Sequence, residues 1–242
     1  MLIINFILTS ILCYFISGIV HELGHIIVGL INGWKFYLLI VGPLGITRNE
    51  HNSIKFYFEK HAAMWGGVSC TLPKEANENN IKIWSKVLLG GPLASIIMGI
   101  IFLPLSIITK NIVFLLLGAM PLGMGIICIL PLPLKTGILY TDGGRWSRLH
   151  KGGQEAAEEI ALFKLTENQI ICRDFSKIDL NSIESLLKSN DIVINYYGYY
   201  YKFQYYKATS NKEKMELVIA KMENIKDKVP ALIVKDCNID KT

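Results

Sequence analysis

Three long runs of the sequence are almost free of charged side chains. Residues 1–34 contain one charged residue, Glu22, and residues 87–109 and 111–134 contain none. Each run is long enough to cross a bilayer, since a membrane-spanning helix needs about 20 mostly apolar residues. We therefore predict a mainly α, polytopic membrane protein. Its three spans are expected at about residues 4–33, 86–109 and 111–134.

The boundaries of these runs distinguish a retained helix from a cleaved signal peptide and show how the second and third runs are connected. A cleaved signal peptide would carry a positive first region and a small-residue cleavage site. No Lys or Arg precedes Lys35, and the first run is longer than the apolar region of a signal peptide, so we expect a retained helix. Only Lys110 and Asn111 separate the second and third runs, which predicts a tight transmembrane hairpin. Its glycines allow close packing, and its prolines are expected to kink or interrupt the helices.

The composition excludes several protein classes. The chain is 51% hydrophobic and 19% charged, whereas soluble domains carry about 25% charged residues and disordered chains combine low hydrophobicity with high net charge. Residues 1–150 hold 11 Lys and Arg against 6 Asp and Glu, and residues 151–242 hold 14 of each class. The positive excess belongs to the apolar half, as in membrane proteins with basic cytoplasmic loops, and not to a polar nucleic-acid-binding surface. We expect the lipid bilayer, and no nucleic acid, as a partner.

The cysteines point to neither disulfides nor a cysteine-based metal site. They are five in number, widely spaced and without a C-x-x-C pair, which is untypical of a disulfide scaffold or of a Cys-ligated zinc site. Cys13 and Cys128 lie in the apolar runs and are interpreted as small buried hydrophobic residues.

Loop charges predict the orientation in the membrane. Seven Lys and Arg residues lie between residues 35 and 86, and the hairpin is followed by Lys135, Arg145, Arg148 and Lys151. The opposite side of the membrane would hold Lys110 alone. Because basic loops stay in the cytosol, we expect a multi-pass protein of the cell membrane with its N-terminus outside and its C-terminal domain in the cytosol.

Two further segments differ from the apolar runs. Residues 35–58 alternate short apolar stretches with turn residues, which predicts a small β-hairpin or sheet. Beyond Gly152 and Gly153, interpreted as a hinge, helical periodicity recurs near residues 154–165, 181–189, 191–208 and 212–227. We therefore divide the chain into a membrane core, residues 1–150, and a soluble helical domain, residues 151–242.

An aromatic stripe marks the C-terminal domain. Seven of the eleven tyrosines lie between Tyr196 and Tyr206. Such a stripe indicates either core packing or a contact with the membrane surface.

His21, Glu22 and His25 form the pattern H-E-x-x-H inside the first apolar run. Residues four apart share one face of a helix, so the two imidazoles can bind one metal ion, and zinc suits such ligands. Glu22 could then act as general base on a metal-bound water and as proton donor to the leaving amine. The alternative is a structural polar cluster, although ionisable side chains inside a membrane are costly and generally functional.

A catalytic zinc needs a third protein ligand, and Asp142 is the foremost candidate. It follows the third apolar run, where a metal ion would compensate for its burial. Gly143 and Gly144 would let the backbone pass close to the metal. The alternative is a helix-capping or turn aspartate paired with Arg145. Three other histidines lie in polar surroundings and are expected at the surface: His51, His61 and His150.

Together these residues resemble the site-2 protease family of intramembrane zinc metalloproteases. That family combines H-E-x-x-H in an early span with an Asp-Gly pair after a later one, here His21–His25 and Asp142-Gly143-Gly144. Gly90–Ser95 is similar to the family's G-P-x-x-[N/S/G] element. Leu130-Pro131, followed by Gly137 and Asp142, is similar to its N-L-x-P…D-G segment. The resemblance covers about residues 1–150.

The resemblance implies a zinc-dependent intramembrane endopeptidase. It would hydrolyse peptide bonds of membrane-embedded or membrane-anchored substrates through a metal-activated water. By motif, one Zn²⁺ per chain would be bound by His21, His25 and Asp142, with Glu22 as the catalytic carboxylate. The resemblance also implies a three-helix metalloprotease core and a membrane-associated sheet at about residues 35–58 that can pair with an unwound substrate.

One residue departs from the family pattern. Cys128 stands where members usually carry Asn, three residues before the proline of the Leu-Pro pair. This departure favours a second hypothesis, a catalytically silent family member that binds a membrane partner, as an immunity-type protein would. A third hypothesis, a small transporter or metal-handling protein, is weakened by the few spans and the lack of an internal repeat. The substrate, the role of the C-terminal domain and the oligomeric state stay open.

Overall fold

The chain is mainly helical, with one small sheet. The computed structural model describes residues 2–49, 52–133, 140–172 and 174–237. The chain forms two compact units, the first comprising Met1–Leu132 and Thr141–Trp146, the second Pro133–Tyr140 and Ser147–Thr242. The division into functional domains at residues 1–150 and 151–242 stays a prediction.

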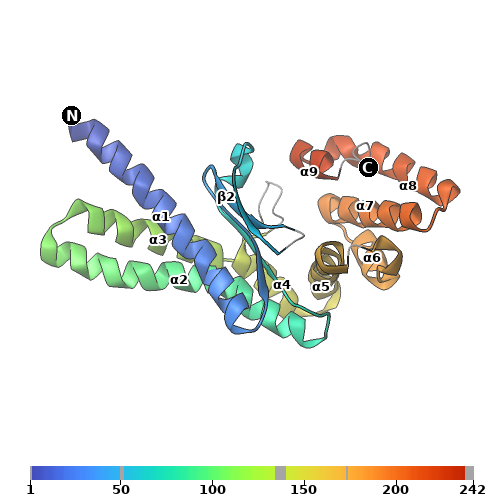
Figure 1. The fold of residues 1–242 in the computed structure, drawn as a ribbon, viewed down its shortest axis with the longest axis horizontal. Coiled ribbons are helices and arrows are strands. Elements are labelled where there is room, and N and C mark those ends of the chain that lie inside the picture. Colours follow the sequence, from blue (N-terminus) through green and yellow to red (C-terminus); the bar gives the residue numbers. More distant parts are fainter. Residues whose placement is uncertain (1, 50–51, 134–139, 173, 238–242) are drawn as a thin grey trace. The chain divides into compact units, whose positions relative to one another are not determined.

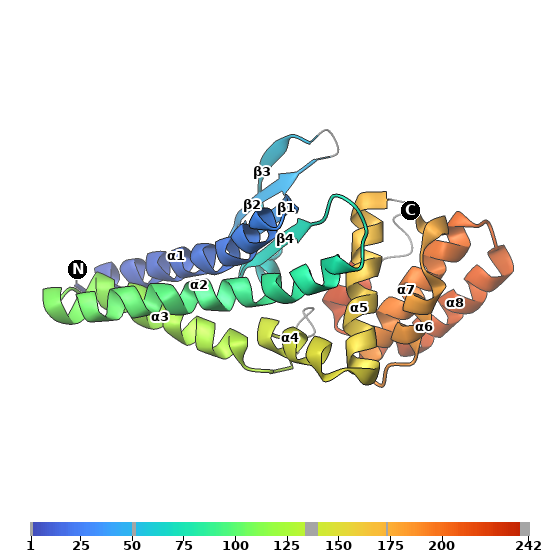
Figure 2. The same ribbon diagram turned by 90° about the horizontal axis from the view of Figure 1, so that it is seen from below.

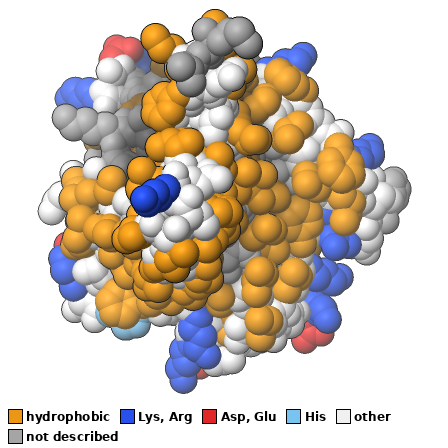
Figure 3. Space-filling view, turned by 90° about the vertical axis from the view of Figure 1, so that its left-hand side faces the viewer, with side chains coloured by type: hydrophobic (Ala, Val, Ile, Leu, Met, Phe, Trp, Pro, Cys, Tyr) orange, Lys and Arg blue, Asp and Glu red, His pale blue; other side chains and the backbone are white. Residues whose placement is uncertain are grey.

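Three helices of the first unit are long and apolar enough to span a membrane, as predicted. They are α1 (Leu2–Ile31), α2 (Asn79–Thr109) and α3 (Ile112–Ile129). Figures 1 and 2 show them side by side. Only 17% of the most apolar window of α1 and α3, and 33% of that of α2, is buried inside the protein. Hydrophobic side chains cover much of the face in Figure 3. So large an apolar surface requires a lipid environment, and the chain is a membrane protein.

The ends of two spans differ from the sequence prediction. α3 ends at Ile129 and not near residue 134, because Leu130 is extended (φ −70°, ψ 141°). Leu130 precedes Pro131, and a proline ring disfavours helical backbone in the residue before it. α2 begins at Asn79, within the polar segment before the apolar run. The helices are not interrupted at their internal prolines, which are Pro92, Pro104 and Pro121.

α1 and α2 cross where glycine meets glycine. A Cβ atom at Gly24 would lie 2.3 Å from the Gly90 carbonyl oxygen, and one at Gly90 would lie 2.6 Å from the Gly24 carbonyl oxygen. Neither position can carry a side chain unless the helices separate. Small residues permit such close approach between helices in a membrane. The crossing therefore holds the H-E-x-x-H segment of α1 tightly against α2.

Residues 35–72 contain a four-stranded antiparallel sheet in the order β3-β2-β1-β4. The strands are β1 (Lys35–Val41), β2 (Leu44–Arg48), β3 (Ile54–Phe58) and β4 (Val68–Leu72). The small sheet predicted at residues 35–58 is confirmed, but β4 was not predicted. β1 and β4 pack against α1, and the outer strand β3 is exposed along its length (Figure 2).

The second unit is built from helices, as the periodicity predicts. They follow α4 (Asp142–Lys151) and are α5 (Gly153–Glu167), α6 (Leu180–Leu187), α7 (Ile192–Ala208), α8 (Lys212–Ile225) and α9 (Ala231–Asp236). Gly152 separates α4 from α5, and Gly152 and Gly153 have φ angles of 76° and 64°. Tyr196 and Tyr201 lie in the two hydrophobic cores of this unit, so core packing explains the aromatic stripe.

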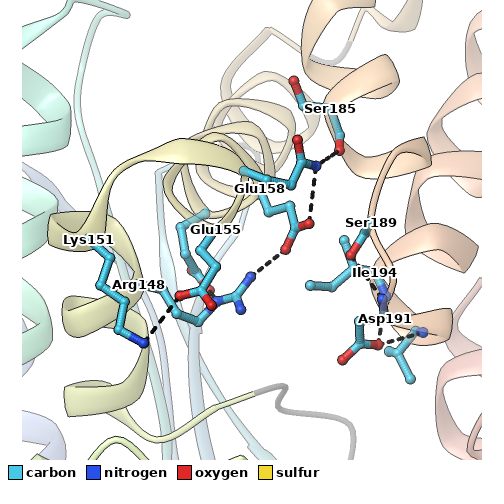
Figure 4. Close-up of polar contacts among 11 residues, drawn as sticks. Arg148, Lys151, Glu155, Glu158, Ser185, Ser189, Asp191 and Ile194 are labelled. Carbon is cyan, nitrogen blue, oxygen red and sulfur yellow. Dashed lines mark hydrogen bonds and ion pairs between the residues drawn. The ribbon is translucent and has the colours of Figure 1, made fainter.

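Arg148 lies in a buried cluster of charges. Its guanidinium donates hydrogen bonds to Glu158 and, at 3.1 Å, to Glu159, and it lies 4.3 Å from the centre of the Tyr140 ring. Figure 4 shows the contact with Glu158. Glu159 is 0% exposed, so the Arg148 guanidinium compensates a carboxylate that is shielded from water. Breaking a buried ion pair leaves an uncompensated charge, which is strongly destabilising.

The glycine crossing predicts a stability difference between two alanine variants. Gly24→Ala is expected to destabilise the protein by about 1–3 kcal/mol, because an added methyl group overpacks the helix contact. Gly123→Ala is the control, since a Cβ atom there meets nothing within 4 Å. Thermal unfolding in detergent, followed by circular dichroism, measures both. Equal midpoints for the two variants would contradict the close crossing.

The buried charge cluster around Arg148 predicts a stability difference between two methionine variants. Arg148→Met is expected to destabilise the second unit by about 3–5 kcal/mol. The matched control is Lys151→Met, which removes an exposed ion pair of 3.5 Å with Glu155 and should change stability by no more than about 0.5 kcal/mol. Limited proteolysis across a temperature series reports the loss of this unit. Similar proteolysis of the two variants would show that the cluster contributes little.

Candidate metal centre

Two imidazoles of α1 and one carboxylate of α4 meet inside the first unit. His21 Nε2 lies 3.3 Å and His25 Nε2 lies 3.5 Å from the same oxygen, Asp142 Oδ2. Asp142 comes 121 residues after His21. The structure thus brings together the three residues predicted as metal ligands. Asp142 does lie in the first turn of α4, but its carboxylate contacts the imidazoles.

The second nitrogen of each ring is held by α2. His25 Nδ1 lies 2.6 Å from the Val87 carbonyl oxygen, which fixes a proton on Nδ1. The Gly91 amide also lies 3.3 Å from this nitrogen, but the much shorter carbonyl contact decides the tautomer. His21 Nδ1 lies 3.0 Å from Ser95 Oγ. Contacts of this kind orient metal-binding histidines, and here they turn both Nε2 atoms toward Asp142.

This arrangement needs a cation. In neutral His25 the proton sits on Nδ1, so Nε2 presents a lone pair to the carboxylate oxygen at 3.5 Å. Two acceptors facing each other repel unless a proton or a metal ion lies between them. Ligand atoms about 2.0–2.1 Å from a tetrahedral zinc lie about 3.3 Å apart, which matches the observed 3.3 and 3.5 Å. These two spacings are compatible with a shared zinc ion, and the ligand atoms of His21 and Asp142 also lie within 4.8 Å of each other and of Cys128 Sγ.

The Asp142 carboxylate is suited to this role. Burial alone would raise the pKa of Asp142, but hydrogen bonds donated by protonated ring nitrogens of His21 and His25, together with their positive charge, hold the pKa below the usual value for aspartate. The group is therefore ionised at neutral pH. An ionised carboxylate is the form that binds a metal ion.

Gly91 of α2 leaves space beside the two imidazoles. A Cβ atom at this position would lie 2.3 Å from His25 Nε2 and 2.8 Å from His21 Nε2. A side chain would therefore enter the space next to the nitrogen lone pairs. Glycine here keeps both nitrogens open to a shared ligand.

Glu22 lies against the start of β4. A Cβ atom at Gly67 (φ 115°) would lie 2.5 Å from Glu22 Oε1, so a side chain at residue 67 would displace the carboxylate. The Ser69 side chain forms a hydrogen bond with Glu22. Glu22 is itself buried. The sheet thus holds this carboxylate next to the two imidazoles of the same helix.

The junction of α3 and α4 fixes Asp142. The Thr141 hydroxyl donates a hydrogen bond of 2.5 Å to the Leu130 carbonyl oxygen. A Cβ atom at Gly143 would lie 1.9 Å from the Ile129 carbonyl oxygen, so only glycine fits there. Both contacts hold the first turn of α4 against the end of α3.

Cys128 belongs to the same group of ligand atoms. Its Sγ, a His21 nitrogen and an Asp142 oxygen all lie within 4.8 Å of one another. Its interpretation as a small buried hydrophobic residue is therefore wrong, since it is only partly buried and lies beside polar groups. The same interpretation holds for Cys13, which is 1% exposed.

The other histidines and the remaining residues of the family pattern complete the comparison with the sequence predictions. His61 and His150 are exposed, as expected. His51 and Gly137, the latter part of the family pattern, lie outside the described residues. Several site residues were not predicted individually, namely Gly67, Ser69, Val87, Gly91 and Ser95. The Gly90–Ser95 element was the sequence signal for the last two.

Comparison with protein families decides the assignment. The model of peptidase family M50 matches residues 9–239. The chain belongs to peptidase family M50. The M50 match extends well past residues 1–150, to which the recognisable motifs are confined. Comparisons with curated proteins and with solved structures found no match. Membership of M50 supports a site-2 protease-like intramembrane metalloprotease.

The space at Gly91 predicts a loss of metal binding. Gly91→Ala is expected to lower zinc affinity by at least about 10-fold, the scale seen when the surroundings of metal ligands change, because its methyl group would collide with both Nε2 atoms. Gly66→Ala is the control, since a Cβ atom there meets nothing within 4 Å. Competition with a chromophoric chelator measures affinity. A folded Gly91→Ala protein with unchanged affinity would refute the assigned position of the metal.

Proposed function

We propose that the protein is a zinc-dependent intramembrane endopeptidase, with His21, His25 and Asp142 as zinc ligands and Glu22 as the catalytic carboxylate. The observation that carries this proposal is the convergence of two imidazole nitrogens on one carboxylate oxygen, at 3.3 and 3.5 Å, with Glu22 adjacent. This donor set has the composition of a catalytic zinc site with three protein ligands. Membership of the M50 family supports the same chemistry.

Different residues of the chain have different roles in the proposed hydrolysis. When bound, zinc supplies a Lewis acid that polarises a carbonyl group and increases the acidity of water. Glu22 takes up the proton of the attacking water and returns it to the leaving amine. The Ser69 hydrogen bond keeps the Glu22 carboxylate oriented for both transfers. Val87 and Ser95 keep the two imidazoles turned toward the site.

The site lies at membrane depth. His21 is ten residues from the end of α1 at Ile31, which is about 15 Å at 1.5 Å per residue. α3 ends at Ile129, next to the site, so its short length brings the α3–α4 junction to the same level. A peptide bond within a membrane-embedded or membrane-anchored substrate is therefore the natural target.

The edge of β4 offers a place for the substrate backbone. Within the described part of the chain, β4 pairs only with β1 and leaves its other edge open. This strand carries Ser69, which bonds to Glu22. A helical substrate hides its carbonyl groups, whereas an extended segment added to a sheet edge keeps its backbone paired while it is held. Pairing at β4 would bring the extended substrate close to Glu22.

The loop charges support one orientation in the membrane. Basic residues concentrate between residues 35 and 86 and again after α3. By the positive-inside rule the N-terminus is outside, and the sheet and C-terminal helices face the cytosol. The protein is then a multi-pass protein of the cell membrane.

A catalytically silent, immunity-type role is the second candidate. It is favoured by Cys128, which replaces the family Asn and lies beside His21 and Asp142. If the missing Asn holds substrate or the developing oxyanion, its loss lowers the rate. The intact H-E-x-x-H motif and Asp142 favour the active enzyme.

Substitution of Glu22 separates chemistry from metal binding. Glu22→Gln should keep about one zinc per chain but lower cleavage by at least about 100-fold, since it cannot accept a proton. His21→Ala and Asp142→Asn should lose both zinc and cleavage. Elemental analysis measures the metal, and comparison of membrane-peptide proteomes from cells with parent protein and Glu22→Gln measures cleavage. Equal cleavage by parent and Glu22→Gln would refute the general-base role, and absence of any parent-dependent peptide would support the silent role.

A further inference from the structure

Cys128 occupies a position that the proposed three-ligand site leaves unexplained. It lies in the last turn of α3, one residue before the helix ends at Ile129. The contacts of Thr141 with Leu130 and of Gly143 with Ile129 lock this turn to the start of α4. Cys128 and Asp142 are therefore held by the same rigid junction.

The sulfur is close enough to share a metal with its neighbours. Its Sγ lies at most 4.8 Å from the His21 and Asp142 ligand atoms. A sulfur and a nitrogen bound to one tetrahedral zinc, at about 2.3 and 2.0–2.1 Å, lie about 3.6 Å apart. A side-chain movement of about 1 Å closes the difference.

The chemistry of the sulfur favours the contact. Thiolate is a stronger zinc ligand than water and than most protein oxygen ligands. An ordinary small hydrophobic residue would gain nothing from the neighbourhood of an imidazole and a carboxylate. A thiol gains a metal bond there and releases its proton to water on binding.

We propose that the Cys128 thiolate is the fourth protein ligand of the resting metal site, together with His21, His25 and Asp142. This inference rests on the proposed zinc site. Catalytic zinc sites keep a position open, whereas four protein ligands close the coordination sphere. With the thiolate bound, the site would have no open position for water or a substrate carbonyl.

Cobalt substitution tests the ligand directly. Co²⁺ bound by a thiolate shows an intense near-ultraviolet charge-transfer absorption that imidazole and carboxylate ligands do not produce. The full-length protein in detergent is titrated with Co²⁺, as are Cys128→Ser, Cys128→Ala and the control Cys172→Ser, which changes an exposed cysteine of the second unit. Parent and Cys172→Ser should show the band. Both Cys128 variants should bind Co²⁺ without it, with at least about 10-fold lower affinity.

A second readout follows the thiol itself. Zinc should protect Cys128 of the parent from alkylation by iodoacetamide, measured by mass spectrometry of the peptide that contains it, and removal of zinc by a chelator should expose it. Alkylation at Cys172 should be the same with and without zinc.

The outcomes separate the two proposals. Co²⁺ binding without the charge-transfer band, or a band that persists in both Cys128 variants, overturns the Cys128 ligand and leaves the proposed function intact. Zinc-independent alkylation of Cys128 overturns it equally. Failure of the folded parent to bind either metal overturns both the fourth ligand and the proposed function.

Discussion

The first unit is organised around three hydrogen-bond acceptors that face one another and need a positive charge between them. They are the Nε2 atoms of His21 and His25 and the Oδ2 atom of Asp142. The two imidazole nitrogens face the carboxylate oxygen at 3.3 and 3.5 Å. A cation at this point would turn their mutual repulsion into attraction. The glycine crossing of α1 and α2, the early end of α3 and the Thr141 contact all serve to bring these groups together.

Local features of the site could be predicted from the sequence, whereas its three-dimensional contacts could not. The spacing of His21 and His25 follows from helix geometry, and Asp142 was found because an acidic residue after an apolar run needs a partner. The contacts of Val87 and Ser95 depend on the register of the α1–α2 crossing, which no single-helix pattern contains. β4 was missed although its sequence, Val-Ser-Cys-Thr-Leu, alternates apolar and polar residues, because the alternation spans only five residues. The end of α3 was overestimated by following apolarity past Pro131.

The second unit lies within the family match although it carries none of the recognised motifs. Its balanced charge and helical periodicity predicted helices, and its tyrosines form cores rather than an exposed stripe. The family match reaches residue 239, although recognisable motifs end near residue 150.

The distance along the chain between His21 and Asp142 has a consequence for biosynthesis. The two residues are 121 positions apart, and at about 5–20 residues per second the ribosome needs roughly 6–24 s to make that stretch. The opening helix therefore reaches the translocon with its polar triplet uncompensated. The proposed zinc site cannot be complete until residue 142 has been made, after the third helix, so a nascent chain arrested earlier would expose an incomplete site to quality control.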